Sequence, residues 1–263
     1  MKQKAEIGGK KIAYSLQGSG HAPVVVLSHS LGVSSEFWGY QLPLLTASYR
    51  VLLYDLPGHG DSEPAGERLS LEQLADDVAG LLEHLRIDRV AFVGLSIGGM
   101  IGQVFALRHP EKLWALVLCS TGSRTDSTTR KLIEDRIARV TETGIESQVE
   151  GAMGRWFTEN FLRSAPATIE WVKNLFRKTS LKGFIGCCGA IQELDTDDQL
   201  SEIKVPTLLI PGELDQAFPE TVSRSIQARI AGAQLYILPG AAHAGNVEQS
   251  HLFNEALINF LAA

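Results

Sequence analysis

Apolar residues are grouped along the chain into short runs, separated by longer segments in which apolar positions have helical spacing. Unbroken runs such as Val24-Val25-Val26-Leu27 are typical of strands buried on both faces of a parallel sheet. Alternation of apolar and polar residues before the first such run predicts a strand with one exposed face. Strands are predicted, in chain order, within 10–20, 23–30, 49–62, 89–96, 113–121, 206–212 and 233–240.

Segments of helical periodicity follow most of these strands. Ser70 opens one of them, with Glu72 and Gln73 in its first turn, and Pro110 ends another. The alternation of strand and helix predicts an α/β fold with a mostly parallel, doubly wound sheet and helices on both faces. Helices are predicted over 34–48, 70–85, 97–110 and 246–261, with a further one after the strand at 206–212.

One long segment breaks the alternation. Between 122 and 203 there are no buried-strand runs, only helical patterns that include several aromatic residues. We predict that this segment is a helical cap inserted into the sheet domain. The predicted organisation is therefore a core of 1–121 and 204–263 with an inserted cap of 122–203.

Composition narrows the classes of function. The chain has 263 residues, of which 44% are hydrophobic and 21% charged, so it can bury the core of one large domain. Its net charge of -6 argues against a nucleic-acid or anionic membrane partner. The N-terminus has no apolar signal segment, no window approaches a membrane span, and only three cysteines are present. We expect a cytoplasmic protein with a small-molecule substrate, and a homo-oligomer is left open.

An unusual group, Gly94-Leu95-Ser96-Ile97-Gly98, lies at a change from strand to helix. A sharp turn there holds a serine in a strained backbone conformation and pushes its hydroxyl outward, toward solvent. The two glycines keep side chains out of the crowded turn, and the following helix points its free amides at the same place. We predict that Ser96 is a nucleophile, because an ordinary turn serine fits poorly between this strand and helix.

A serine hydroxyl needs a base, and the base needs an acid that orients it. His243 follows the last predicted strand and Asp215 the one before it, so both belong at the same edge of the sheet as Ser96. The chain order Ser, Asp, His is the order expected for a G-x-S-x-G turn on such a sheet. Glu213 and Asp126 remain alternatives to Asp215 as the acid.

Other polar residues after buried strands are predicted to have structural roles. His29 braces the loop that carries it, His59 is structural, and Asp55 holds neighbouring loops by hydrogen bonds. No two histidines have the spacing of metal ligands on one helix, so no metal site is expected. The adjacent Cys187 and Cys188 lie in an apolar helical stretch, which indicates packing rather than redox chemistry.

Two backbone amides are predicted to stabilise a developing oxyanion. One belongs to Leu31, in the loop after the strand at 23–30, and the other to Ile97, directly after the predicted nucleophile. Losing one such donor typically lowers the rate by about 10²–10³. Ser30, in the same loop as Leu31, and Trp156, at the end of a predicted cap helix, are candidate substrate contacts.

These loops, in this order, resemble the α/β-hydrolase fold over the whole chain. A closer resemblance is to the β-ketoadipate (3-oxoadipate) enol-lactone hydrolases of aromatic catabolism, and it includes the cap. It is carried by LSHSLGVSSEFW, YDLPGHGDS, FVGLSIGGMIGQ, GRWFT, GCCGAIQELD and HAGNVEQ.

This resemblance implies a serine hydrolase that opens a small carboxylate-bearing lactone through an acyl-enzyme, without a cofactor. It also implies a cation in the cap for the substrate carboxylate. Arg136, Arg155 and Arg163 are the candidates, and Arg136 aligns with an arginine of the enol-lactonase cap. The alternative for each is a solvated surface arginine.

Other functions fit the same motifs. A carboxylesterase or general lactonase would use the same three side chains with a less cationic pocket. A carbon–carbon bond hydrolase of the meta-cleavage type would share the fold and the cap. A ligand receptor without enzymatic activity is a different class, which would bind tightly without multiple turnovers.

Overall fold

The apolar runs form the centre of one eight-stranded sheet in the computed structural model, which describes residues 2–64, 66 and 68–263. Strands β3 to β8 pair in parallel, whereas β1 and β2 are antiparallel to their neighbours. The α/β class is therefore confirmed. The strand order across the sheet is β1 (Gln3–Ile7), β2 (Lys10–Gln17), β4 (Arg50–Tyr54), β3 (Val24–Ser28), β5 (Val90–Leu95), β6 (Leu113–Cys119), β7 (Thr207–Ile210) and β8 (Gln234–Leu235).

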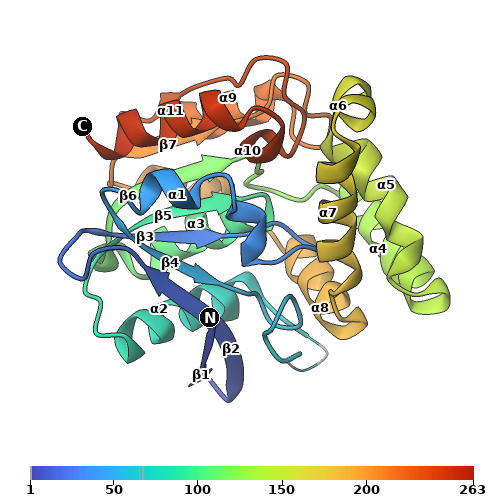
Figure 1. Cartoon of the computed structure of the whole chain (residues 1–263), viewed down its shortest axis with the longest axis horizontal. Helices are drawn as coiled ribbons and strands as arrows, with labels where there is room; N and C mark the ends of the chain where they lie inside the picture. The colour runs from blue at the N-terminus through green and yellow to red at the C-terminus, as the bar shows by residue number, and fades with distance from the viewer. Residues whose placement is uncertain (1, 65, 67) are drawn as a thin grey trace.

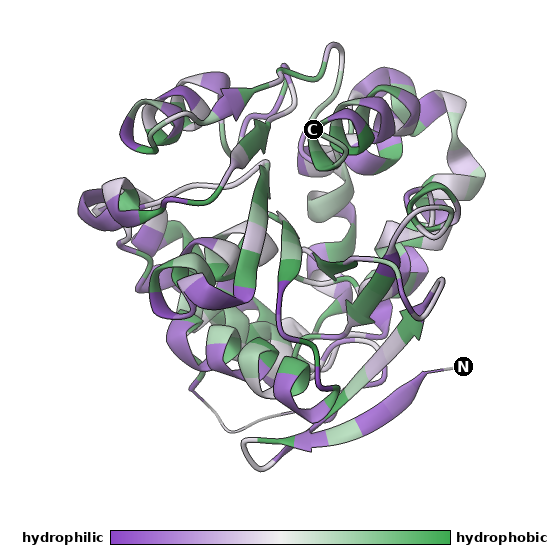
Figure 2. Ribbon diagram, turned by 90° about the vertical axis from the view of Figure 1, so that its left-hand side faces the viewer, coloured by the Kyte–Doolittle hydropathy of each residue, from purple (hydrophilic) through white to green (hydrophobic). Residues whose placement is uncertain are grey.

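The central strands are buried on both faces, as their unbroken apolar runs predict. Every residue of β3 and of β5 is buried. Helices cover both faces of the sheet, and hydrophobic residues concentrate on its strands (Figure 2). Burying a valine or leucine side chain completely contributes about 1.5–3 kcal/mol, so these strands form a rigid base for the loops at their ends.

Helix α2 of the sheet domain begins where the sequence places its cap. Ser70 and Gln73 form a reciprocal capping box at the start of α2 (Leu71–His84). The first residues of α3 (Ile97–Arg108) are buried against the sheet. The remaining helical elements of this domain are η1 (Ser35–Trp38), α1 (Leu42–Leu45), η2 (Pro110–Lys112), α9 (Glu220–Arg229), α10 (Gly245–Glu248) and α11 (Ser250–Leu261).

Three predictions for the sheet domain were wrong in detail. The helix predicted over 34–48 is divided into η1, which ends before Gly39, and α1, whose first turn contains Pro43. The helix predicted over 246–261 is interrupted at Gln249, whose φ of -124° is not helical. In the strand predicted over 233–240, only Gln234–Leu235 joins the sheet, followed by an isolated bridge from Leu238 to Gly212.

The connection from β6 to β7 is helical. The predicted boundaries of the cap, 122 and 203, both fall within this connection. Figure 1 shows its five α-helices grouped together beside one end of the sheet. They are α4 (Ser127–Thr143), α5 (Glu146–Trp156), α6 (Glu159–Ser164), α7 (Pro166–Arg177) and α8 (Leu181–Gln192), followed by η3 (Asp197–Glu202). No helix among the described residues is both long and apolar enough to cross a bilayer.

Candidate active site

Ser96 lies in the tight turn between β5 and α3, with φ 58° and ψ -118°. A non-glycine residue with positive φ is uncommon and costs on the order of 1–3 kcal/mol, so the surrounding structure must hold it. A Cβ on Gly94 would lie 2.1 Å from the carbonyl oxygen of Gly98, and one on Gly98 would lie 2.2 Å from that of Ser28. The predicted need for glycine at both positions is confirmed.

The exposure predicted for Ser96 was wrong. The residue is only 8% exposed rather than turned toward solvent. Neighbouring strand ends surround the turn: Ser28 pairs with Gly94, and the Thr121 hydroxyl donates to the Ser96 carbonyl at 2.8 Å. The sharpness of the turn was evident from the sequence, but the loops that enclose it come from distant segments.

His243 and Asp215 form a buried pair at the same edge of the sheet. Nδ1 of His243 lies 2.9 Å from Oδ2 of Asp215, and both residues are 3% exposed. The other Asp215 oxygen accepts from the amides of Ala217 at 2.8 Å and Phe218 at 3.1 Å. Burial raises the pKa of Asp215, but His243 and these amides outweigh it and lower the pKa overall. The carboxylate therefore stays ionised and directs an Nδ1–H toward itself, leaving Nε2 as the basic atom.

Within the described residues, no hydrogen bond joins the Ser96 hydroxyl to His243. Such contacts are often long before substrate binds and shorten in the reacting complex. The two residues follow β5 and β8 of the same parallel sheet, so both lie at the carboxyl ends of the strands.

The alternative acids have other partners. Glu213 accepts from the amide of Gly240 at 2.8 Å, and Asp126 caps α4 by accepting from the amide of Thr129 at 2.7 Å. The structure thus joins His243 to Asp215 rather than to either alternative.

The amides of Leu31 and Ile97 donate to no protein acceptor among the described residues, so both N–H groups are free to bind an oxyanion. Ile97 opens α3, where the first amides of a helix have no intrahelical acceptor. The loop that carries Leu31 follows Ser28, whose strand β3 pairs directly with β5. The two amides therefore come from adjacent strand ends, as an oxyanion site requires.

His29 braces this loop, as predicted. Its Nε2 accepts from the Leu56 amide at 2.9 Å, so the proton resides on Nδ1, which donates to the Ser30 carbonyl at 2.8 Å. That carbonyl belongs to the same peptide group as the Leu31 N–H, so His29 fixes the direction in which the amide points. Burial lowers the pKa of His29 to about 4, which keeps the ring neutral in this role.

The neighbouring polar residues are structural, also as predicted. Asp55 accepts from the amide of Ser35 at 2.8 Å, the amide of Asp61 at 2.9 Å and the Lys2 ammonium at 2.7 Å. His59 is buried beside His29, with ring centroids 5.4 Å apart. Cys187 and Cys188 are buried free thiols, so the packing predicted for them is confirmed. No group of three or more potential metal ligands is found among the described residues.

Aromatic side chains line the His243 ring. The Trp156 ring centroid lies 6.3 Å from that of His243, and the Trp156 carbonyl accepts from the Ala244 amide at 2.9 Å. Phe218 approaches from the loop after β7 that carries Asp215 (the acid loop), and its ring centroid lies 5.8 Å from that of His243. Ser30, the other candidate contact, is 2% exposed in the loop beside β5.

The cap brings two of the three candidate arginines together. Arg136 is half-buried on α4, and Arg155 lies near it at the end of α5 with part of its surface exposed. Burial and the charges of Arg136 and Arg139 lower the pKa of Arg155 to about 10. The guanidinium groups of Arg136, Arg139 and Arg155 have no carboxylate partner among the described residues. Arg163 is separate: it lies on α6, three-quarters exposed, 3.9 Å from Glu159.

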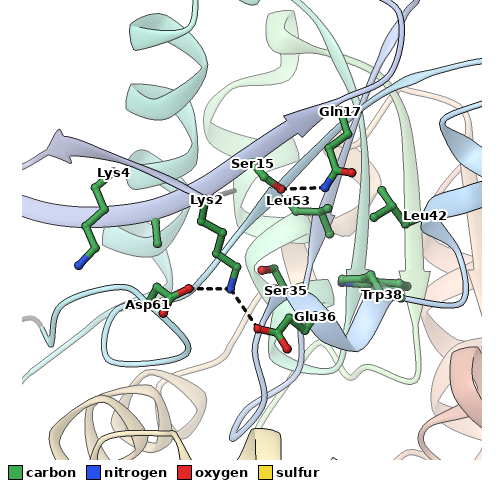
Figure 3. A pocket seen from close by; sticks show the side chains of 12 residues that line it. Lys2, Lys4, Ser15, Gln17, Ser35, Glu36, Trp38, Leu42, Leu53 and Asp61 are labelled. Atoms are coloured by element: carbon green, nitrogen blue, oxygen red, sulfur yellow. Dashed lines mark hydrogen bonds and ion pairs between the residues drawn. The ribbon is translucent and has the colours of Figure 1, made fainter.

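A cavity of about 510 Å³ lies elsewhere, between the β1–β2 hairpin, η1 and the loop after β4 (Figure 3). The Lys2 ammonium lies in it, 3.4 Å from Asp61 and 3.8 Å from Glu36. None of its lining residues is a candidate site residue. The site is therefore defined by the strand-end loops and not by this cavity.

The sequence profile of the α/β hydrolase fold matches residues 23–250, which is most of the chain. This chain belongs to the α/β hydrolase family. The 3-oxoadipate enol-lactonase 2 of Acinetobacter baylyi is 31% identical to it over 93% of this chain and 90% of that protein. A protein of Rhizobium rhizogenes, named as a candidate carbamate hydrolase, RutD, is also 31% identical over 92% and 94%.

A solved structure also supports membership of this family. The crystal structure of the enol-lactonase from Burkholderia xenovorans LB400 superposes with a TM-score of 0.96 at 33% identity. It covers 99% of this hydrolase and 100% of the other chain, cap included.

The sequence analysis missed three residues that lie beside the candidate site residues of this hydrolase. Arg139 follows Arg136 by one helical turn, so its spacing was a usable signal. Phe218 lies three residues after Asp215, in a loop whose course the sequence does not determine. Glu248 hydrogen-bonds both the cap and the His243 loop, a contact that depends wholly on tertiary structure.

Proposed function

We propose that this hydrolase is a serine hydrolase that opens a small carboxylate-bearing lactone of the 3-oxoadipate enol-lactone type. Ser96 is the nucleophile, His243 the base, Asp215 the orienting acid, and the Leu31 and Ile97 amides bind the oxyanion. The observation that carries the proposal is the buried His243–Asp215 bond of 2.9 Å at the sheet edge where Ser96 is held in its strained turn. The likeness to enol-lactonases over the whole chain supports the lactone.

In the first half-reaction, Ser96 Oγ attacks the ring carbonyl while its proton passes to His243 Nε2. The carbonyl oxygen becomes an oxyanion and accepts from the two free amides. As the carbonyl re-forms, the ring C–O bond breaks, and the enol oxygen leaves with the electron pair and takes the proton from His243. The leaving group stays attached to the acyl group, because both belonged to one ring.

Water completes the reaction. It attacks the acyl carbon and gives a proton to His243, and the bond from Ser96 to the acyl carbon then breaks. Ser96 takes the proton back from His243, and the product is an open-chain acid whose enol converts to the ketone. Asp215 stays ionised throughout and stabilises the imidazolium at each step.

The free carboxylate of such a substrate needs a cation. Arg136, Arg139 and Arg155 form an unpaired cationic group in the cap, which supports an anionic substrate. Arg136 is the preferred partner, because it is half-buried on the face of α4 that also carries the buried Ile133 and Val140. A guanidinium there would hold the carboxylate with charge-assisted hydrogen bonds.

A carbamate is the second candidate substrate. RutD proteins from several bacteria match this chain at an identity similar to that of the enol-lactonases, as in the Rhizobium and Caulobacter examples. The same nucleophile and oxyanion donors can act on a carbamate carbonyl.

Replacing Arg136 by leucine is expected to raise KM for an anionic enol-lactone by about 10- to 100-fold, since a hydrogen bond to a charged group contributes about 1.5–3 kcal/mol. KM for a neutral aryl acetate should change little. Initial rates with the wild type and the variant on both substrates make the comparison, with Arg163→Leu as the matched control because Arg163 lies exposed on α6. Equal effects of Arg136→Leu on both substrates would remove Arg136 from the site.

The same assay identifies the reaction. The wild type is given the enol-lactone, the aryl acetate, a small carbamate and a vinylogous diketone side by side. The proposal requires the enol-lactone to have the highest kcat/KM. A preference for the carbamate would favour the second candidate, preference for the diketone would indicate carbon–carbon bond hydrolysis, and binding without multiple turnovers would indicate a receptor.

A further inference from the structure

Glu248 hydrogen-bonds two segments that lie 90 and six residues away from it in the sequence. Its Oε1 accepts from the Thr158 amide at 3.0 Å and from the Thr158 hydroxyl at 2.5 Å. Its Oε2 accepts from the Ala242 amide at 2.8 Å. Each carboxylate oxygen therefore binds a different part of the molecule, the cap on one side and the residue before His243 on the other.

The cap side of this contact is the segment that follows Trp156. Thr158 is the N-cap of α6, and its hydroxyl accepts from the Phe161 amide at 3.3 Å while it donates to Glu248. Two residues before Thr158, the Trp156 carbonyl accepts from the amide of Ala244. The junction of α5 and α6 thus contacts the His243 loop both directly and through Glu248.

The acid loop holds the opposite side of the His243 loop. The Leu214 amide donates to the Ala241 carbonyl at 2.8 Å, and a Cβ on Gly212 would lie only 2.1 Å from the Ala242 carbonyl oxygen. Together with the bond from His243 to Asp215, these contacts fix the loop on its sheet side. On the side of the Ala242 and Ala244 amides, its position depends on Glu248 and Trp156.

We propose that Glu248 is a positioning residue that couples the placement of the cap to the placement of the His243 imidazole, an inference that rests on the proposed function. Its three hydrogen bonds tie the α5–α6 junction to the backbone immediately before the base. Movement of this junction shifts the Ala242–Ala244 backbone, and with it the reach of Nε2 toward the Ser96 hydroxyl. Glu248 touches no substrate atom and acts only through His243.

The test compares Glu248→Ala and Glu248→Gln with Glu255→Gln, a matched control at an exposed position of α11. Glu248→Ala is expected to lower kcat for the aryl acetate by about 10- to 100-fold, because a displacement of about 1 Å can cost 10²-fold. Glu248→Gln keeps one acceptor oxygen, so a smaller loss of about threefold to tenfold is expected. Glu255→Gln should match the wild type.

Two readouts separate positioning from a structural role. The first is the rate at which an aryl phosphonate ester modifies the wild type and each variant, which depends on His243 but not on the natural substrate. The second is the pH profile of kcat/KM for the aryl acetate. Coupling predicts that phosphonylation slows in parallel with kcat and that the profile changes, while melting temperatures stay well above the assay temperature.

A lower melting temperature with wild-type kcat and phosphonylation rate would overturn the inference. If Glu248→Ala does not fold, Glu248→Gln is subject to the same criterion. Failure of the proposed function is distinguishable, because the wild type would then be unreactive toward the phosphonate or would not open the lactone.

Discussion

Replacing Ser96 by alanine is expected to lower kcat for the enol-lactone and the aryl acetate by about 10⁴-fold or more. Losing the nucleophile of a Ser-His-Asp triad has an effect of this size. The oxygen that forms the acyl-enzyme is absent in the variant, and no other described hydroxyl occupies this turn. Folding should persist, since the Ser96 hydroxyl forms no hydrogen bond among the described residues and α3 is not capped by its side chain. Turnover and thermal melting of purified protein make the measurement.

The control for this variant is Ser120→Ala. Ser120 directly follows β6, is buried and also has a positive φ, of 42°, so it shares the backbone strain without a place in the proposed chemistry. Its activity should stay within about threefold of the wild type, as for a substitution outside the reacting groups. Activity of a well-folded Ser96→Ala within tenfold of the wild type would rule out Ser96 as the nucleophile.

Replacing Asp215 by asparagine is expected to lower kcat by about 10⁴-fold, with only a modest change in melting temperature. The amide is close in shape to the carboxylate, but it removes the charge that stabilises the imidazolium and permits the wrong histidine tautomer. His243 has no other hydrogen-bond partner for its ring among the described residues, so no neighbour compensates. Steady-state rates on the aryl acetate are the readout.

The alternative acids supply matched variants for this experiment. Glu213→Gln and Asp126→Asn should each retain activity near that of the wild type, because neither carboxylate contacts His243. An inactive Glu213→Gln beside an active Asp215→Asn would reverse the assignment of the acid.

Strands and loop order could be predicted from the sequence because they depend on local patterns. The run Val24–Leu27 is typical of a strand buried on both faces of a parallel sheet, and Gly94 and Gly98 are required by the turn between them. Ser96, Asp215 and His243 each follow a strand, so the topology alone gathers them at one edge.

The features that were missed depend on distant contacts. β1 was not predicted, because its residues are largely polar and it joins the sheet only through the hairpin with β2. The burial of Ser96 and the role of Glu248 come from loops that fold over the strand ends from elsewhere in the chain. Arg139 is the exception, since its helical spacing from Arg136 was visible in the sequence.

The central claim is that the Ser96 hydroxyl attacks the substrate carbonyl with the help of His243 and Asp215. Mass spectrometry of the protein after reaction with an aryl phosphonate ester tests this most directly. We expect one adduct, located on the peptide that contains Ser96, formed in proportion to the loss of activity and absent in Ser96→Ala. Loss of activity with the adduct on a different residue, or full activity with Ser96 completely modified, would contradict it.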